Sequence, residues 1–171
     1  MPSARPRDGK FTVRATAVFG LIVVIASATL ARSQRLELTL ELQAMCETQA
    51  RNVFQQMEDQ RKKDPYSKDF KRLSSDYQSH YNAKINKCLM LMEVTETLGD
   101  DIIQRSTSSY LIDAYERRDM ASYLWISRKN KSDEEVPPMT CELALAASDQ
   151  KKKNCTTREE FDAFVAEYME K

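Results

Sequence analysis

The chain contains little of what most enzyme and metal sites need. Its 171 residues include one histidine, His80, and no G-x-S-x-G segment that would present a nucleophilic serine. The D-x-D-x-D-G spacing of a calcium loop is missing as well. These absences argue against a classical hydrolase triad and against a metal site, and they leave His80 as the one catalytic candidate.

The chain also has no excess of charge of either sign. Lysine and arginine total 26, aspartate and glutamate total 26, and the formal net charge is +0. A nucleic-acid-binding protein needs a basic face and a high isoelectric point. We therefore expect no nucleic-acid partner. The one basic run, residues 151–153, is short and is interpreted as a solvated turn.

No two of the four cysteines are closer in sequence than Cys141 and Cys155. Structural zinc sites normally include a close pair such as C-x₂-C, and thiol redox enzymes use C-x-x-C. We therefore expect no zinc site, no redox centre and no cofactor. An even number of well-separated cysteines is typical of two disulfides in an oxidising compartment.

Three pairings of the four cysteines are possible. We favour Cys46–Cys88 with Cys141–Cys155, because pairing of nearest neighbours constrains each end of the domain locally. In the chain-entropy treatment the longer loop would contribute about 4 kcal/mol to stability and the shorter loop about 3 kcal/mol.

What the sequence does have is an uncharged apolar run near its N-terminus, residues 15–31. Basic residues precede this run at Arg5, Arg7, Lys10 and Arg14. A basic segment followed by an apolar one is the signature of export through a membrane or of insertion into it. The pattern therefore predicts that the residues from about 32 onward lie outside the cytoplasm.

Two interpretations of the apolar run remain open. Cleavage is favoured by Ala26-Ser27-Ala28, which fits the small-x-small motif of a signal-peptidase site. Retention as an anchor is favoured by the basic residues on its inner side, although a helix of this length, about 25 Å, is slightly short of the ~30 Å hydrocarbon core. The protein would be periplasmic or secreted after cleavage, and a single-pass inner-membrane protein otherwise.

The exported part, residues 32–171, has the size of a single domain. Apolar residues between positions 42 and 57 follow helical spacing without Gly or Pro. They predict a helix over about 38–61 that carries Cys46 on its buried face. This helix should end before Asp64-Pro65, because proline disfavours a helical conformation in the preceding residue.

The segment after the first helix predicts an antiparallel meander. Residues 81–86 alternate between apolar and polar, and residues 88–94 are apolar at almost every position, as in a strand covered on both faces. Asn86-Lys87 is interpreted as a bulge between the two patterns. Residues 108–115 and 120–127 are interpreted as a hairpin with a four-residue connection.

The chain closes with a strong helix signal. Thr157 and Glu160 have the spacing of a capping box, and the apolar residues of 161–169 form one continuous face. Residues 141–146 are interpreted as a further strand or a short helix. The expected fold class is α+β: an antiparallel β-meander packed against an N-terminal and a C-terminal helix, stapled by two disulfides.

Aromatic residues crowd the predicted hairpin. If several lay on one exposed face, they would form a binding patch, and otherwise they fill the space between sheet and helices. The candidates are Tyr110, Tyr115, Tyr123 and Trp125.

The exported part resembles a group of uncharacterised bacterial exported proteins with four cysteines. The resemblance is carried by Cys46 on the first helix, the HYNAKINKC block at residues 80–88, the LIDAYE strand at residues 111–116, and the terminal EFDAFVAEYM helix. It implies a Gram-negative source and a periplasmic location, and it brings no activity or binding residues.

Two functions therefore remain as hypotheses. The first is a non-enzymatic exported module, periplasmic or tethered to the inner membrane, that binds a protein or a component of the envelope. The alternative is a small periplasmic hydrolase that uses His80 with a nearby serine or aspartate. A hydrolase requires His80 to lie in a pocket within hydrogen-bond reach of such a group. If uncleaved, the N-terminal segment would also hold the protein in the membrane.

Overall fold

The computed structural model divides the chain into two units, Met1–Thr39 and Leu40–Lys171. In the first unit the structure describes the helical backbone from Thr16, with side chains from Glu37 onward. Within the described residues, no helix combines the length and the hydropathy of a membrane span. No side chain of the predicted signal or anchor segment, residues 1–31, is among those that the structure describes. The described residues are 16–98, 105–127, 136–145 and 151–170.

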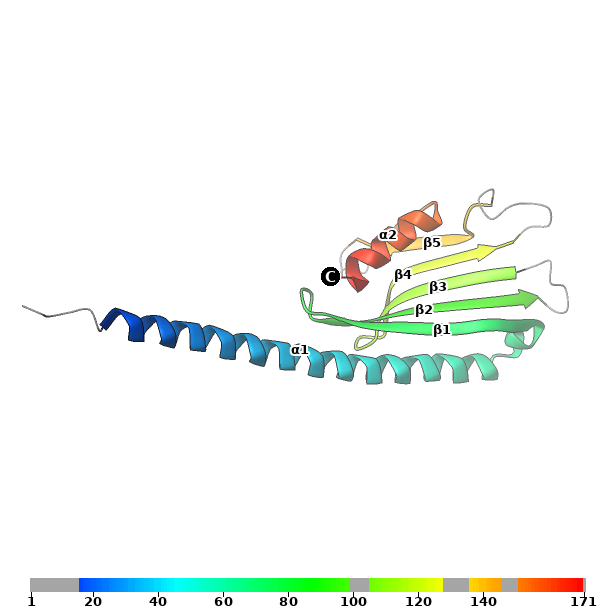
Figure 1. The fold of residues 1–171 in the computed structure, drawn as a ribbon. Coiled ribbons are helices and arrows are strands. Elements are labelled where there is room, and N and C mark those ends of the chain that lie inside the picture. The colour runs from blue at the N-terminus through cyan, green and yellow to red at the C-terminus, as the bar shows by residue number, and fades with distance from the viewer. Residues whose placement is uncertain (1–15, 99–104, 128–135, 146–150, 171) are drawn as a thin grey trace, which may run out of the picture. The chain divides into compact units, whose positions relative to one another are not determined.

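The second unit is an antiparallel meander with helices on both faces, which confirms the predicted α+β class. Six strands pair in sequence order, β1-β2-β3-β4-β5-β6. In Figure 1 the second-unit part of α1 runs below the sheet and α2 lies above it. The elements are α1 (Thr16–Lys63), η1 (Pro65–Asp69), β1 (Phe70–Asn82), β2 (Lys87–Leu98), β3 (Arg105–Asp113), β4 (Arg118–Ile126), β5 (Thr140–Ala144), β6 (Lys152–Asn154) and α2 (Arg158–Met169).

Strand β2 is buried on both faces, as its nearly continuous apolar sequence predicted. Met90 and Met92 pack in a cluster with Ala50 of α1. Leu89, the residue before Met90, packs in the opposite cluster with Phe161 of α2. The sheet therefore separates two apolar cores, one under each helix.

Helix α1 extends beyond the interval predicted from the sequence. It was expected over about 38–61, and it runs over Thr16–Lys63. Its C-terminal end is as predicted, because Pro65 follows and the carboxylate of Asp64 accepts a hydrogen bond from the Tyr66 N–H at 3.0 Å. That bond starts the short helix η1, which returns the chain toward β1.

Strand β1 was missed, and the bulge predicted at Asn86-Lys87 is wrong. The residues expected to continue a strand, 83–86, instead form a tight turn between β1 and β2. The side chain of Asn82 accepts a hydrogen bond from the Lys84 N–H at 3.0 Å, and Asn86 adopts a left-handed φ of 54°. Asparagine tolerates both roles better than most residues, so the chain reverses here.

The predicted hairpin is confirmed, with its connection two residues earlier than expected. Strands β3 and β4 pair, and residues 114–117 join them. Asp113 accepts hydrogen bonds from the N–H groups of Tyr115 and Glu116, both at 3.1 Å, and Arg117 has φ 55°. The turn after Asn82 has the same plan: an Asx residue, then Ala, two variable residues, a left-handed residue and a basic one.

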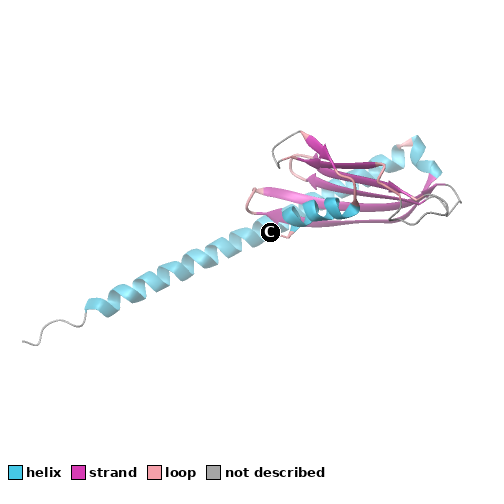
Figure 2. Cartoon of the chain, turned by 90° about the horizontal axis from the view of Figure 1, so that it is seen from above, coloured by secondary structure: helices cyan, strands magenta, loops and turns pink. Residues whose placement is uncertain are grey.

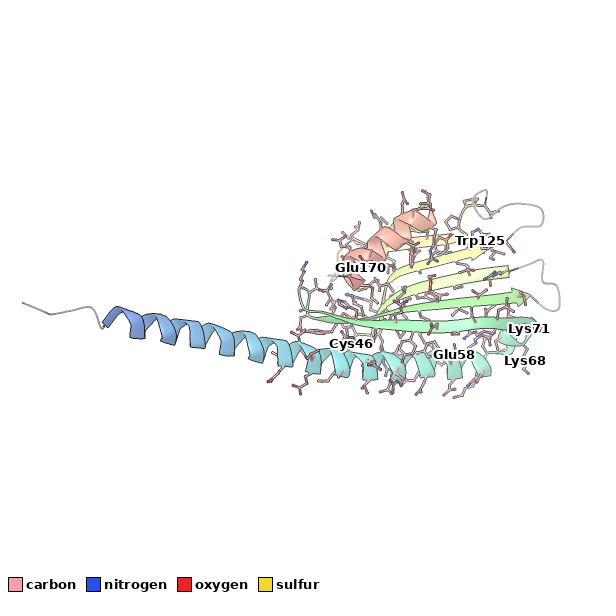
Figure 3. All side chains as sticks on the ribbon, in the orientation of Figure 1. Cys46, Glu58, Lys68, Lys71, Trp125 and Glu170 are labelled. Carbon is pink, nitrogen blue, oxygen red and sulfur yellow. A yellow bond between two sulfur atoms is a disulfide. The ribbon has the colours of Figure 1, made fainter. Side chains whose placement is uncertain are left out.

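Both predicted disulfides are present. Cys46–Cys88 joins α1 to β2 with a Cα–Cα distance of 5.2 Å, and Cys141–Cys155 joins β5 to the segment before α2 with one of 5.0 Å. Disulfides of this kind are typical of an oxidising, non-cytoplasmic compartment. Figure 3 shows Cys46 on the part of α1 that lies beside β1.

Helix α2 begins as predicted, with one change in its cap. Thr157 accepts a hydrogen bond from the Glu160 N–H at 3.3 Å, whereas the Glu160 carboxylate accepts from the N–H of Thr156, at 2.7 Å, rather than from Thr157. Phe161 and Val165 are buried against the sheet. Figure 2, seen from above, shows α2 in front of the strands.

Two short strands complete the sheet. Residues 141–146 were expected to form either a strand or a short helix. Most of them belong to strand β5, which pairs with β4. The lysine run interpreted as a solvated turn contributes instead to β6, which pairs with β5 along Lys152–Asn154. Its three residues are exposed and two are lysines, a composition that protects a sheet edge from further pairing.

The other edge of the sheet, β1, is closed by side chains. Gln43 of α1 accepts a hydrogen bond from the Tyr81 N–H at 2.7 Å and donates a longer one to the Ser79 carbonyl at 3.4 Å. Arg61 donates to the Phe70 carbonyl at 3.1 Å at the opposite end of the strand. The Gln43 amide thus replaces the backbone of a neighbouring strand.

We expect Gln43→Ala to destabilise the domain by about 1 kcal/mol and to promote self-association, because it uncovers edge donors and acceptors. Urea unfolding and light scattering as a function of concentration measure the two effects. Gln56→Ala, at an exposed position of the same helix, is the matched control. Identical behaviour of the two variants would show that Gln43 does not protect the edge.

Candidate functional site

The four aromatic residues proposed as a patch do not gather on one face. Tyr123 and Trp125 are buried beneath α2: the Tyr123 ring lies 5.6 Å from that of Phe161, and Trp125 Nε1 donates to the Val136 carbonyl at 3.1 Å. Figure 3 labels Trp125 on the upper strands. Tyr110 belongs to the opposite core. Tyr115 is exposed in the β3–β4 turn. Binding through the hairpin stays a prediction, and of these residues only Tyr110 lines the groove described below.

His80 lies in β1 opposite Leu89, on the face of the sheet that α2 covers. Its Nε2 atom is buried and has no hydrogen-bond partner among the described residues. A hydrolytic base needs a nucleophile or a substrate proton within hydrogen-bond reach. The geometry offers no such partner to Nε2, and the hydrolase hypothesis gains no support from it.

An unpaired buried nitrogen costs stability, so we expect His80→Leu to stabilise the domain by about 1 kcal/mol. The change keeps a similar side-chain size and removes the polar atom. Urea unfolding at neutral pH measures the gain in stability. Gln78→Leu, at an exposed position on the same face of the sheet, is the control. A large loss of stability in His80→Leu alone would show that the imidazole makes bonds in solution that the structure does not contain.

A groove opens on the α1 side of the sheet, at the end where α1 gives way to β1. Its volume is about 340 Å³, at the lower end of the range of small-molecule sites. We call it the α1 groove. Its lining comes from five elements and the residue before η1: Met57, Glu58 and Arg61 of α1, Asp64 before η1, Tyr66 and Ser67 of η1, Phe70 and Arg72 of β1, Met92, Val94 and Glu96 of β2, and Ser108 and Tyr110 of β3.

The sheet register explains the floor of the α1 groove. Val94 lies opposite Ser108, and Met92 lies opposite Tyr110, so all four side chains share the face that α1 covers. Ser108 is small, and it leaves space where a larger side chain would meet the helix. The groove is therefore built into the pairing of β2 with β3.

Four charged residues form one network along the wall of the groove. Glu96 Oε1 accepts from Arg61 Nε at 2.7 Å and from Arg72 Nε and Nη2 at 3.3 Å each. Glu58 Oε1 accepts from Arg72 Nη1 and from the Ser75 hydroxyl, the latter at 3.0 Å. The four charged side chains are between 19 and 24 % exposed, so water screens these pairs only in part.

This network fixes the end of α1 against β1 and β2. Arg72 and Glu96 are direct partners across the two strands, while Glu58 and Arg61 lie one turn apart on the helix. Figure 3 labels Glu58 near the C-terminal end of α1, in the part that runs beside β1. The walls of the groove are therefore held in place before any ligand enters.

Sequence reasoning missed the α1 groove altogether. Its charged members lie far apart in the chain, and Arg72 lies outside every helix and strand that the sequence predicted. One signal was present: Glu58 and Arg61 are spaced as neighbours on a helix face. Nothing in the sequence indicated that Glu96 would meet both arginines.

The described residues contain no group of three or more His, Cys, Asp or Glu side chains arranged to hold a metal ion. No known protein family matches the chain, and no curated protein or solved structure resembles it at a significant level. The resemblance to exported four-cysteine proteins remains a prediction from the sequence. The case for function therefore depends on the geometry of this chain.

Proposed function

We propose that this chain is an exported, non-enzymatic binding domain that holds a component of its compartment in the α1 groove. The observation that carries the proposal is the groove itself, which combines apolar and aromatic walls with a fixed set of polar groups. Ligand sites commonly have this composition, with few polar groups to orient the ligand and apolar area to hold it.

Export is supported by two features of the chain. The N-terminal sequence has the pattern of a signal peptide or anchor. The two disulfides are typical of proteins that mature in an oxidising compartment. In protein isolated from its natural host, alkylation before reduction should therefore modify no cysteine, and alkylation after reduction should modify all four.

The binding role is tested by native mass spectrometry of the protein purified gently from its natural host. We expect the wild-type protein to carry a bound species, and Ser108→Phe to lose it because the new ring fills the floor of the α1 groove. Ser122→Phe is the matched control, since Ser122 lies opposite Tyr110 on the same face of the sheet and does not line the groove.

The outcomes separate clearly. Loss of the bound species from Ser108→Phe alone supports the proposal. Retention by both variants, or a wild-type protein that carries nothing, contradicts it. Urea unfolding of both variants shows whether any loss of the ligand reflects loss of the fold.

A further inference from the structure

We propose that the α1 groove selects a small organic cation, an ammonium or guanidinium group on an apolar body. This inference rests on the proposed binding function and adds the chemistry of the ligand. It follows from which polar groups of the groove are already engaged and which are not.

The positive groups of the groove are engaged within the protein. All three guanidinium nitrogens of Arg72 donate to Glu58 or Glu96. Arg61 donates from Nε to Glu96 and from Nη2 to the Phe70 carbonyl. An anionic ligand would have to compete with these internal acceptors for both arginines.

The negative groups retain unused acceptors. In the described network, every hydrogen bond to Glu58 and Glu96 goes to Oε1. Asp64 uses Oδ1 for the Tyr66 N–H. None of the second oxygens of these carboxylates accepts a hydrogen bond from a described residue, and none is a buried atom without a partner, so solvent reaches them. Three carboxylates against two guanidinium groups also leave the lining net negative.

Aromatic rings supply the second part of the recognition. Tyr66, Phe70 and Tyr110 line the same groove, and Tyr66 is 77 % exposed while Phe70 is 38 % exposed. Ring faces attract cations, and they also cover the apolar body of an amine. Exposed aromatic residues beside an excess of carboxylates therefore favour an organic cation over a neutral or anionic ligand of the same size.

The volume limits the size of the ligand. About 340 Å³ accommodates a compact molecule rather than a long chain. A phenylethyl group with one amine fits this description, and it has soluble neutral and anionic counterparts of similar shape. These serve as probes: phenethylammonium, 2-phenylethanol and 3-phenylpropionate.

The test is a titration of the folded domain with each probe, followed by amide chemical shifts in nuclear magnetic resonance spectra. We expect saturable shifts at the groove residues with phenethylammonium, and an affinity about 10-fold higher than that for 2-phenylethanol. We expect 3-phenylpropionate to bind more weakly than either. Ser108→Phe should abolish the shifts caused by phenethylammonium.

A charge variant isolates the electrostatic part. Asp64→Asn keeps the cap of η1, because asparagine caps helices as well as aspartate does, and it removes one negative charge from the lining. We expect this variant to lower the affinity for phenethylammonium several-fold and to leave the affinity for 2-phenylethanol unchanged. Asp59→Asn, at an exposed acid outside the groove that pairs with Lys62, is the matched control and should change neither affinity.

Equal affinity for the three probes would overturn the cation proposal, as would saturable binding that Asp64→Asn leaves unchanged. So would the absence of saturable binding by any probe. These results leave the proposed binding function standing if the native ligand is still lost from Ser108→Phe alone. If native mass spectrometry shows no bound species, or shows it retained by Ser108→Phe, the proposed binding function itself is contradicted.

Discussion

Replacing Cys46 and Cys88 together by alanine should lower the free energy of unfolding by about 4 kcal/mol, because the bond closes a loop of more than forty residues in the unfolded chain. Both cysteines are fully buried, so their replacement also removes packing beneath α1. Urea unfolding of the double variant measures the loss.

The position of this disulfide predicts a local effect as well. It is the one disulfide between α1 and the sheet in the described part of the chain, and beyond it the helix is held by contacts such as the hydrogen bond from Gln49 Nε2 to the Ala114 carbonyl at 3.0 Å. Without the bond, α1 should separate from β1 and β2 more often. Limited trypsin digestion should then cut within α1, at Arg51, well before the domain unfolds.

The second disulfide provides the control. Replacing Cys141 and Cys155 together should cost about 3 kcal/mol, since the loop is shorter, and should leave α1 protected from trypsin. Equal rates of cleavage at Arg51 in the two double variants would show that the disulfide does not hold the helix to the sheet.

The sequence predicted those parts of the fold that depend on neighbouring residues. The cap and apolar face of α2 are local patterns, and α2 begins after Thr157 as expected. The nearly continuous apolar run of β2 indicated burial on both faces, and the two helices provide it. The disulfide pairing followed from the spacing of the cysteines.

Strand β1 shows why the rest could not be predicted. It is an edge strand of thirteen residues, and most of its residues are polar or charged. Only one of its faces is well covered, and its unpaired edge depends on Gln43, a residue nearly forty positions earlier in the chain. A strand stabilised in this way has no strong local pattern.

The failure to predict the turn after Asn82 is a different kind of error, because the sequence contained the information needed to identify it. The residues Asn82-Ala83 and Asn86-Lys87 repeat the arrangement of Asp113-Ala114 and Arg117-Arg118. Comparing the two would have identified both as turns. The alternating polarity before Asn86 was interpreted as a strand because periodicity was weighted above turn chemistry.

The α1 groove could not be derived from the sequence at all. It depends on the register that sets Val94 against Ser108, and on the meeting of Arg61, Arg72 and Glu96 from three elements. Register and long-range ion pairs are properties of the assembled sheet. Candidate residues selected by type alone therefore led to His80 and the aromatic hairpin rather than to the groove.

The buried carboxylate of Asp113 should make Lys87 one of the most sensitive positions in the domain. Asp113 is 1 % exposed, and its Oδ2 pairs with Lys87 Nζ, which also lies 3.0 Å from Glu116 Oε1. We expect Lys87→Met to destabilise the domain by about 3–5 kcal/mol, because it leaves a buried charge without its partner. Urea unfolding at neutral pH measures this.

The pH dependence of the wild-type protein follows from the same pair. Burial disfavours the Lys87 ammonium, but hydrogen bonds to Asp113 and Glu116 outweigh it and raise its pKa above the ordinary value of 10.5. Its contribution to stability is therefore fully present below about 10.5, the unfolded value, and is lost as pH rises through the folded pKa. Wild-type stability should fall in that alkaline range, and Lys87→Met should lack this component.

Combining Lys87→Met with Asp113→Asn separates the charge from the turn. Asparagine retains an oxygen for the N–H groups of Tyr115 and Glu116, so the turn between β3 and β4 keeps its hydrogen bonds while the buried charge is removed. The double variant should recover most of the stability lost in Lys87→Met. If it is no more stable than Lys87→Met, the loss comes from packing around the lysine chain, and the buried charge of Asp113 is not its cause.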